Sequence, residues 1–499
     1  MSVRTKAILV VGVITAAAGF LRLDGLGQPS RKVFDEIYYA SDGCWSAGYD
    51  YRDCGLDADV ERSWVHPPLG KTMVGWGIDA FGNGAFGWRF SAAVAGTLTV
   101  ALAGALAFLL TTSWLWAGVG ALLVGTEHLL FVQSRIAMLD VFLAMFVVLG
   151  FVLLVWDRRR NLEVEEPPPV EVPEPEPVPV PTRDDAWLDE PPEAHGPLVG
   201  VPAARSSPAE ALVAVKLPGL VRPLRVLAGA AFGAAIAVKW SGGLALLAAL
   251  LLAVGWERSH RRAIGERRPL GRALVDQWPG LLLAFVMVPL LVYLAAWGPW
   301  LSNRDYDLGA LVGHHAEMAD YHRTLSTENE EGDPIHPYMS RASTWLLLGR
   351  PVVYHFDAEQ WGEPGATAHE IIAIGNPVIF WGSLLVIPTL LLVWILRRRW
   401  QAGVVVAAVL VQYLPWLAVT RPLFLFYMTP VTPFLALGVT LILRDLADVR
   451  LGGRRALAPL AAAGVLASVA AFVFFWPVLT AETVSTEAWQ MRMWFSGWV

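Results

Sequence analysis

The chain has 499 residues, of which 55% are hydrophobic and 16% are charged, and its formal net charge is −6. Soluble globular domains have about a quarter charged residues, so this composition excludes an ordinary soluble domain. Apolar runs of about 20 residues, the length that a helix needs to cross the hydrocarbon core, recur along the chain. The sequence therefore predicts an all-α polytopic membrane protein, and no nucleic-acid partner is predicted.

Eleven apolar runs are predicted to be transmembrane helices. They cover residues 7–25, 88–110, 115–132, 137–156, 222–238, 241–256, 278–297, 378–396, 402–420, 423–443 and 457–476. These runs divide the chain into five predicted parts. The parts are an N-terminal transmembrane part (1–156) with an outer loop at 26–87, a cytoplasmic linker (157–221), a second transmembrane part (222–297), a second outer loop (298–377) and a C-terminal transmembrane part (378–499).

Basic residues at the ends of these runs predict the orientation, because cytoplasmic loops carry an excess of Lys and Arg. Clusters precede the first run and follow the fourth, sixth, eighth and tenth runs: Arg4 and Lys6; Arg158, Arg159 and Arg160; Arg258, Arg261 and Arg262; Arg397, Arg398 and Arg399; and Arg444, Arg450, Arg454 and Arg455. With the N-terminus in the cytoplasm every cluster lies inside, whereas Arg31 and Lys32 lie outside. The first run is predicted to be an uncleaved anchor, since no small-residue cleavage site ends it.

The predicted linker is acidic and rich in proline. Residues 161–200 hold eleven acidic residues and one basic residue, a net charge of −10, so the rest of the chain sums to +4. Such a composition cannot bury enough apolar surface to fold, which predicts a disordered segment; a docking site for a cytoplasmic partner is the alternative. The negative charge of the whole chain therefore carries no information about the substrate.

Cys44 and Cys54 are the only cysteines in the sequence, and both fall in the first outer loop. Disulfides persist outside the cytoplasm, and the spacing of the pair fits neither a zinc site nor a CxxC redox motif. A structural disulfide is the favoured interpretation, with two unrelated thiols as the alternative.

Polar residues of several kinds fall at the predicted outer ends of the spans. They are Asp35, Glu36, His66, Lys71, Arg89, Arg135, Asp140, Lys239, Asn376 and Arg421. A lone acidic pair suits a helix N-terminus, and a lone basic residue suits snorkelling towards the headgroups. Several basic residues close to two carboxylates are less readily explained in this way, because ionisable groups at membrane depth usually face a cavity or a partner. Together they predict an outward-facing anion site that also holds a base.

A lipid phosphate fits such a site. Its head would pair with Arg and Lys at the outer surface while its tail stays in the bilayer. A carboxylate could then take a proton from an incoming hydroxyl as the phosphate leaves, with nearby cations stabilising the leaving charge. The residues thus predict a glycosyl or related transferase that uses a lipid-phosphate donor.

Seven segments between about residues 20 and 445 resemble, in the same order, the protein O-mannosyltransferase family in its actinobacterial form. They are "VFDEIYYA", "HPPLGK", "QSRIAMLD", "AVKWSGG", "HPYMSRASTWLLLGRPVVYHF", "IGNPVIFW" and "RPLFLFYMTPVTPFLALG". The resemblance implies a GT-C fold with eleven spans in the cell membrane. It implies an inverting transfer of mannose from a polyprenyl-phosphate mannose donor to Ser or Thr of exported proteins, with a translocon as one possible source of these acceptors.

The resemblance also implies roles for single residues. Asp35 corresponds to the catalytic base and Glu36 to its essential neighbour. Arg89 and Lys239 resemble ligands of the donor phosphate, with Arg135 assisting. Motif positions that shape the site are His66, Lys71 and Asp140, and the "HPYMS" segment brings His336 and Tyr338 towards the donor or acceptor. Asn376 and Arg421 are further predicted site residues.

No cofactor and no metal site are predicted, since Asp35 and Glu36 alone provide too few ligands for Mg²⁺. Unlike the eukaryotic members, the chain has no β-trefoil MIR insertion in its second outer loop. Two other classes remain open. A sibling GT-C enzyme would glycosylate a lipid or a polysaccharide, whereas a transporter would place its charged groups near the middle of the membrane in broken helices.

Overall fold

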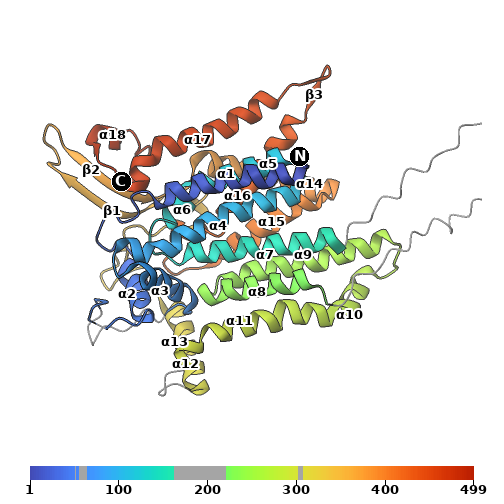
Figure 1. The fold of residues 1–499 in the computed structure, drawn as a ribbon, viewed down its shortest axis with the longest axis horizontal. Coiled ribbons are helices and arrows are strands. Elements are labelled where there is room, and N and C mark those ends of the chain that lie inside the picture. The colour runs from blue at the N-terminus through green and yellow to red at the C-terminus, as the bar shows by residue number, and fades with distance from the viewer. Residues whose placement is uncertain (51, 56–64, 162–220, 302–306) are drawn as a thin grey trace, which may run out of the picture.

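The computed structural model describes residues 1–50, 52–55, 65–161, 221–301 and 307–499, so residues 162–220 of the predicted linker lie outside the described residues. Helices of different lengths lie side by side and form the body of the molecule (Figure 1). In chain order they are α1 (Val3–Leu23), α4 (Ala85–Thr111), α5 (Trp114–Gly125), α6 (His128–Gln133), α7 (Asp140–Asn161), α8 (Pro223–Val238), α9 (Gly242–Ala263), α10 (Pro269–Leu282), α11 (Val288–Ala296), α14 (Pro377–Arg397), α15 (Trp400–Tyr413), α16 (Thr432–Ala447) and α17 (Ala458–Thr480).

Eight helical stretches in the described part of the chain are long and apolar enough to cross a membrane, and α5 and α8 are shorter apolar helices. Helix α7 packs against α4 on one side and α8 on the other, which places it in the centre of the bundle. Small residues allow close contacts here: a Cβ on Gly229 of α8 would lie 1.8 Å from the Ala284 carbonyl oxygen. The prediction of a helical membrane protein is confirmed, while the count of eleven spans and the five-part division stay predictions.

The boundaries of three predicted spans are wrong. The run 115–132 is broken at Glu127, whose carboxylate accepts hydrogen bonds from the backbone of Leu129 and Leu130 and starts the separate helix α6. The run 423–443 has a short 3-10 helix at Leu425–Met428 and becomes α-helical only at Thr432, because prolines at 422, 430 and 433 interrupt its first part and Pro433 suits a helix start. The run 278–297 begins earlier, at Pro269, and passes through a π-helical turn at Leu283–Met287.

The two predicted outer loops fold at the same end of the bundle (Figure 1). The first contains α2 (Glu36–Ser46) and α3 (Leu69–Phe81). These two helices approach closely because Gly75 has no side chain: a Cβ at this position would lie 2.3 Å from the Ser46 hydroxyl. The second contains α13 (Leu308–Thr324) and the antiparallel strands β1 (Val352–Glu359) and β2 (Thr367–Ala373). Strand β5 (Val484–Ser485) joins β2 in antiparallel pairing, so an otherwise helical fold carries a small sheet that the sequence analysis did not predict.

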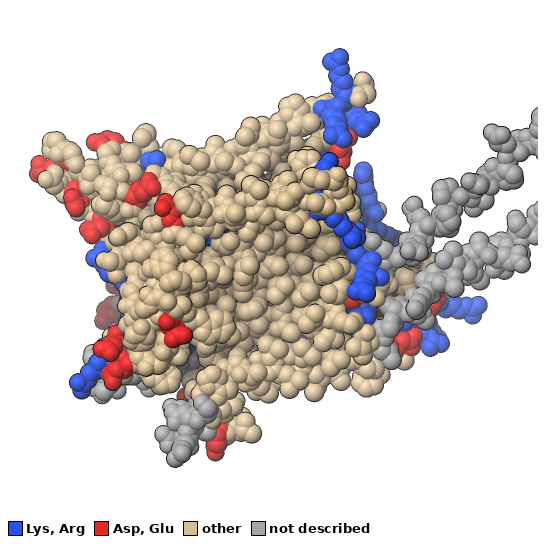
Figure 2. Space-filling view, viewed as in Figure 1, with Lys and Arg blue, Asp and Glu red and all other residues tan. Residues whose placement is uncertain are grey.

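The opposite end of the bundle is basic. Figure 2 shows Lys and Arg side chains gathered where the chain begins and where the described segments on either side of residues 162–220 end. The short strands β3 (Arg450–Leu451) and β4 (Arg454–Arg455) form a hairpin at this end. The charge separation along the bundle is the pattern expected of a protein whose basic end faces the cytoplasm.

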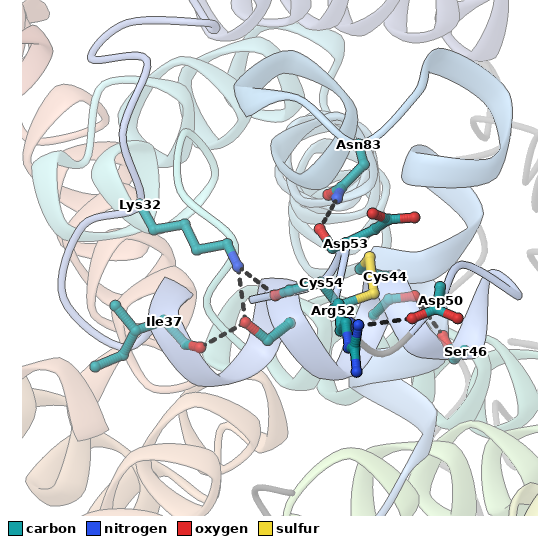
Figure 3. Close-up of a disulfide and its surroundings, with 11 residues drawn as sticks. Lys32, Ile37, Cys44, Ser46, Asp50, Arg52, Asp53, Cys54 and Asn83 are labelled. Atoms are coloured by element: carbon teal, nitrogen blue, oxygen red, sulfur yellow. Dashed lines mark hydrogen bonds between the residues drawn. A yellow bond between two sulfur atoms is a disulfide. The ribbon is translucent and has the colours of Figure 1, made fainter. Parts of the chain in front are cut away.

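Cys44 and Cys54 form a disulfide, as favoured from the sequence (Figure 3). The bridge ties the C-terminal end of α2 to the following loop. Lys32 strengthens this connection by donating to the Ser41 hydroxyl at 2.7 Å and to the Cys54 carbonyl at 3.0 Å. On the other side, the Asn83 amide donates to the Asp53 carbonyl at 2.9 Å. The first outer loop is therefore a cross-linked structure that holds α2 in place.

Candidate active site

Asp35 occupies the cap position immediately before α2, at the end of the bundle that carries the two predicted outer loops. Its neighbour Phe34 has a positive φ of 47°, an unfavourable conformation for a bulky side chain. Three aromatic rings hold Phe34 there, with centroids 4.6 Å away for Tyr354, 5.8 Å for Phe426 and 5.9 Å for His336. Strained residues of this kind persist where the surrounding packing over-determines them. The packing of Phe34 thus fixes the backbone that carries the Asp35 carboxylate.

The environment of Asp35 raises the pKa of its carboxyl group to about 6. Burial is the main cause, and the negative charge of Asp140 adds to it. Lys239 and the Tyr39 hydroxyl act in the opposite direction by favouring the carboxylate. A carboxyl with this pKa is largely ionised at neutral pH and is still a better proton acceptor than an ordinary aspartate.

Glu36 is wholly buried. Arg89 of α4 binds its carboxylate through two hydrogen bonds of 2.8 Å, one to each oxygen. The backbone N–H groups of Val33 and Ala137 donate to the same two oxygens at 2.9 and 2.8 Å. Glu36 therefore connects α2, the segment before it, α4 and the turn before α7.

Arg89 uses all five of its N–H donors within the protein. Besides Glu36, its guanidinium donates to the carbonyls of Leu26 at 3.1 Å, Pro29 at 2.9 Å and Arg31 at 3.1 Å. No donor is left for a phosphate. The geometry therefore argues against the predicted contact of Arg89 with the donor and favours a role in holding the segment that leads to Asp35.

Arg135 and Asn376 also make contacts that stabilise the fold. Arg135 Nη1 donates to the carbonyls of Leu21, Arg22 and Asp24, which end α1. Asn376 accepts from the Val378 N–H at the start of α14, and its amide donates to backbone carbonyls of two other segments. The phosphate contact predicted for Arg135 lacks support in this arrangement.

Lys239 lies at the C-terminal cap of α8 and pairs with Asp140 in the first turn of α7. Its ammonium lies 3.0 and 2.8 Å from the two carboxylate oxygens, although the residues are 99 positions apart. The ammonium also lies 5.1 Å from the Tyr427 ring and 5.7 Å from the Phe426 ring. The ammonium thus contacts a carboxylate and two aromatic rings, and Lys239 also borders a cavity.

This cavity has a volume of about 210 Å³, and its lining includes residues of both predicted outer loops. It is lined by His66, Asp140, Lys239, Trp240, Ser241, Leu244, His322, Trp416, Arg421 and Tyr427. Arg421 places its guanidinium over the rings of Trp416 and Tyr427, at 5.8 and 5.7 Å. Asp35 is not among the lining residues, but its carboxyl group interacts electrostatically with two of them, Lys239 and Asp140. The site combines two cations, aromatic walls and an adjacent carboxylate of raised pKa.

The two histidines of the cavity stack on one another, with ring centroids 5.6 Å apart. Burial and the nearby cations Lys239 and Arg421 lower the pKa of His66 well below its usual value, and they also lower the pKa of His322. His322 Nε2 donates to the Val65 carbonyl at 3.0 Å and so connects α13 to the segment before His66. Both rings are therefore neutral at physiological pH and add no positive charge to the site.

Three other predicted site residues lie outside the cavity lining. The Lys71 ammonium of α3 lies 3.1 Å from an Asp42 oxygen of α2, in a buried pair between these helices. His336 packs its ring against Phe34, and its Nδ1 accepts from the Tyr338 N–H at 3.2 Å. These residues support the loop around Asp35. No group of three or more potential metal ligands is found among the described residues.

The sequence analysis missed several residues of this site. His322 and the cavity residues Trp240, Trp416 and Tyr427 were not singled out, nor was Phe34. Trp240 directly follows Lys239, and Tyr427 lies six residues after Arg421 in the same motif. Their closeness in sequence to predicted site residues could have indicated that they belong to the site. His322 lies on α13, far from every motif in sequence, and nothing in its neighbourhood indicated that it reaches the site.

The chain is similar to known proteins in sequence and in fold. Residues 12–165 match the family model described as dolichyl-phosphate-mannose-protein mannosyltransferase, and residues 308–498 match that of the C-terminal four-TMM region of protein-O-mannosyltransferase. The chain is 28% identical to a polyprenol-phosphate-mannose–protein mannosyltransferase of Mycolicibacterium smegmatis, over 99% of this chain and 93% of the relative. A relative of the same name from Mycobacterium tuberculosis is 29% identical, over 99% and 92%.

Two solved structures share the fold. The Saccharomyces cerevisiae protein O-mannosyltransferase Pmt1-Pmt2 complex bound to the sugar donor matches with a TM-score of 0.71 and 14% identity, over 100% of this chain and 93% of that chain. ArnT from Cupriavidus metallidurans in the apo state matches with a TM-score of 0.51 and 14% identity, over 96% and 77%. The predicted GT-C fold is confirmed by these matches.

Proposed function

The chain belongs to the protein O-mannosyltransferase family of membrane glycosyltransferases, and on this premise we propose that it transfers mannose from a polyprenyl-phosphate mannose donor to Ser or Thr hydroxyls of exported proteins. The observation that carries the proposal is the cavity lined by Lys239 and Arg421, together with the electrostatic interaction of Lys239 with the Asp35 carboxyl group. Two cations suit the phosphate of a lipid-linked sugar, and a carboxylate of raised pKa suits a hydroxyl acceptor.

In the proposed reaction, Asp35 takes the proton from the acceptor hydroxyl while the hydroxyl oxygen attacks C1 of the mannose. The bond between C1 and the phosphate oxygen breaks, and its electron pair leaves with the lipid phosphate. Attack from the face opposite the phosphate inverts the configuration at C1. Lys239 and Arg421 stabilise the charge that develops on the leaving phosphate. Lys239 is held for this task by Asp140, which accepts two hydrogen bonds from it.

Glu36 and Arg89 are positioning residues in this proposal. Their buried pair anchors α2 one residue after Asp35, and the packing of Phe34 anchors the residue before it. A base that is fixed on both sides can meet the acceptor hydroxyl in one geometry, which is worth several orders of magnitude in rate for well-oriented groups.

The active site is proposed to lie on the outer face of the cell membrane, with the N-terminus in the cytoplasm. The separation of charge along the bundle supports this orientation, because Lys and Arg side chains gather at the end opposite α2 (Figures 1 and 2). The disulfide beside α2 supports it as well, since disulfides persist outside the cytoplasm.

The test is an assay with membranes that contain the chain and polyprenyl-phosphate mannose labelled in the sugar. A Ser/Thr peptide, the same peptide with Ala at these positions, and a polyprenyl lipid are offered as acceptors in parallel. Label on the Ser/Thr peptide alone is expected. Label on the lipid, with none on the peptide, would instead assign the chain to a sibling GT-C activity.

A further inference from the structure

Trp240 lies in the turn between α8 and α9, directly after Lys239, and its partly exposed indole lines the cavity of the proposed active site. Two other aromatic residues of the lining, Trp416 and Tyr427, have the Arg421 guanidinium over their rings. In the part of the chain that the structure describes, no cation lies over the Trp240 ring. This indole is therefore the aromatic surface of the cavity that the two cations leave for a different part of a ligand.

A chain of hydrogen bonds fixes this indole. Trp240 Nε1 donates to the Tyr293 hydroxyl of α11 at 3.0 Å, and this hydroxyl lies 2.7 Å from Nε2 of His315 on α13. The chain ends where His315 Nδ1 lies 2.7 Å from the Leu311 carbonyl oxygen, one turn earlier on the same helix. The hydrogen bonds therefore connect the cavity wall to the second predicted outer loop.

The partners determine the direction of each of these hydrogen bonds. An indole N–H can only donate a hydrogen bond, and a backbone carbonyl can only accept one. A neutral His315 consequently carries its proton on Nδ1 and offers a lone pair at Nε2. The Tyr293 hydroxyl donates to that lone pair and accepts from Trp240. Each donor in the chain has one acceptor, so a single arrangement satisfies every group.

Ring packing restrains the same residues. The His315 ring stacks on the Trp240 indole, with centroids 6.1 Å apart and an angle of 26° between the planes. It also packs against Trp297, whose ring centroid lies 4.9 Å away and which is only 2% exposed. His315 is thus hydrogen-bonded through both ring nitrogens and packed against a buried tryptophan. It forms a fixed support for the Trp240 indole.

We propose that Trp240 packs against the sugar of the lipid-linked donor, and that Tyr293 and His315 are positioning residues that hold its indole in the cavity wall. The inference rests on the proposed function and adds a sugar contact to it. Lys239 and Arg421 provide charge for the phosphate, whereas an indole provides a large apolar surface for the C–H groups of a sugar ring. Neither Tyr293 nor His315 lines the cavity, so both act through Trp240.

The first measurement follows Trp240 without any assay of transfer. The full chain is labelled with fluorotryptophan, and Trp240→Phe identifies the fluorine NMR resonance of Trp240 by its absence. Tyr293→Phe removes the hydroxyl to which both neighbours are hydrogen-bonded and should shift or broaden this resonance. The control is Tyr413→Phe, which removes a hydroxyl that donates to the Ala342 carbonyl at 2.8 Å outside the cavity lining and should leave the Trp240 resonance unchanged.

Two variants of His315 separate its two hydrogen bonds. The amide of His315→Gln reaches the position of Nε2 and can still accept from Tyr293. The amide of His315→Asn reaches only the position of Nδ1, so it can still donate to Leu311 but cannot accept from Tyr293. Both variants remove the ring equally. If His315 acts through Tyr293, the Trp240 resonance of His315→Gln stays close to that of the unaltered chain, whereas His315→Asn shifts it as Tyr293→Phe does.

Binding of polyprenyl-phosphate mannose and of polyprenyl phosphate is then measured on the same proteins. Tyr293→Phe and His315→Asn should weaken binding of the mannose donor roughly 3- to 30-fold. They should change binding of polyprenyl phosphate much less, because this lipid carries no sugar. His315→Gln should recover part of the loss, and Tyr413→Phe should show none.

An unchanged Trp240 resonance in Tyr293→Phe would overturn the inference, and so would equal weakening of the two lipids. It would also be overturned if His315→Asn behaved as the unaltered chain does and His315→Gln did not, because His315 would then only support α13. Donor binding that depends on Tyr293, in a chain that transfers no mannose to a Ser/Thr peptide, would support the inference and overturn the proposed function.

Discussion

Arg89 and Glu36 form a buried, two-pronged ion pair that joins α4 to the first residue of α2. The pair leaves neither partner free for a substrate, because the remaining donors of Arg89 and the remaining lone pairs of Glu36 bind the backbone. The two neighbouring acidic residues, Asp35 and Glu36, therefore have different roles. The Asp35 carboxyl group interacts with Lys239 and Asp140, which line the cavity, and Glu36 holds the helix that follows Asp35.

Replacing Asp35 by Asn tests the proposed base. The amide keeps the size of the side chain and cannot accept the proton, so the turnover of mannosyl transfer should fall roughly 10²- to 10⁴-fold. Donor binding should persist, because the cations of the cavity are unchanged. Single-turnover transfer and donor binding are measured on the same preparation. Near-normal turnover of Asp35→Asn would show that another group acts as the base.

The pH dependence of kcat/KM should report the pKa of Asp35, which is raised to about 6. Protonation removes the base, so the rate should be constant above neutrality and fall about tenfold per pH unit well below pH 6. Because the Asp140 charge contributes to the raised pKa of Asp35 and Lys239 opposes it, Asp140→Asn should move this fall to lower pH.

The control for this shift is Asp357→Asn, which removes an exposed carboxylate paired with Arg31 on the same side of the bundle. Its pH profile should equal that of the unaltered chain. If Asp140→Asn left the pH profile unchanged, the fall of kcat/KM at low pH would be due to the protonation of a group other than Asp35.

Substitutions in the buried pair should act on stability before they act on chemistry. Arg89→Met leaves the Glu36 carboxylate buried without its cation, and such a loss costs about 3–5 kcal/mol of unfolding free energy. The double variant Glu36→Leu/Arg89→Met removes both charges and should recover part of this loss. Thermal unfolding of the three proteins in one detergent measures the difference. A double variant less stable than Arg89→Met would show that the hydrogen bonds of Glu36 to the backbone outweigh the ion pair.

Lys239 and Arg421 should determine the affinity for the donor. Charge-assisted hydrogen bonds to phosphate are worth about 1.5–3 kcal/mol, so Lys239→Ala and Arg421→Ala should each weaken binding of polyprenyl-phosphate mannose roughly 10- to 100-fold. Lys239→Arg should restore part of the rate, since a planar guanidinium does not replace a compact ammonium.

Arg31→Ala is the matched control, because this side chain is exposed and pairs with Asp357 away from the cavity. It should leave donor affinity within about twofold. If Lys239→Ala and Arg421→Ala behaved like Arg31→Ala, both cations would be snorkelling residues and the phosphate would bind elsewhere.

Much of the fold follows from local properties of the sequence. An apolar run must form a helix in the membrane because its backbone groups find no other partners there, so the existence of most spans was predictable. The polar motifs sit at the turns between these spans, which is why Asp35, Asp140 and Lys239 could be placed at one end from sequence alone. The breaks at Glu127 and before Thr432 were harder to predict, since a capping side chain and three prolines act against strong apolar runs.

The tertiary structure decided what each charged residue does. Arg89 and Lys239 look alike in the sequence, each a cation at the outer end of a span, yet one is enclosed by Glu36 and three carbonyls and the other borders a cavity. The partners come from segments 53 and 99 residues away. An ion pair over such distances in sequence depends on how the helices pack, because the free energy of a buried charge is set by the few groups that touch it.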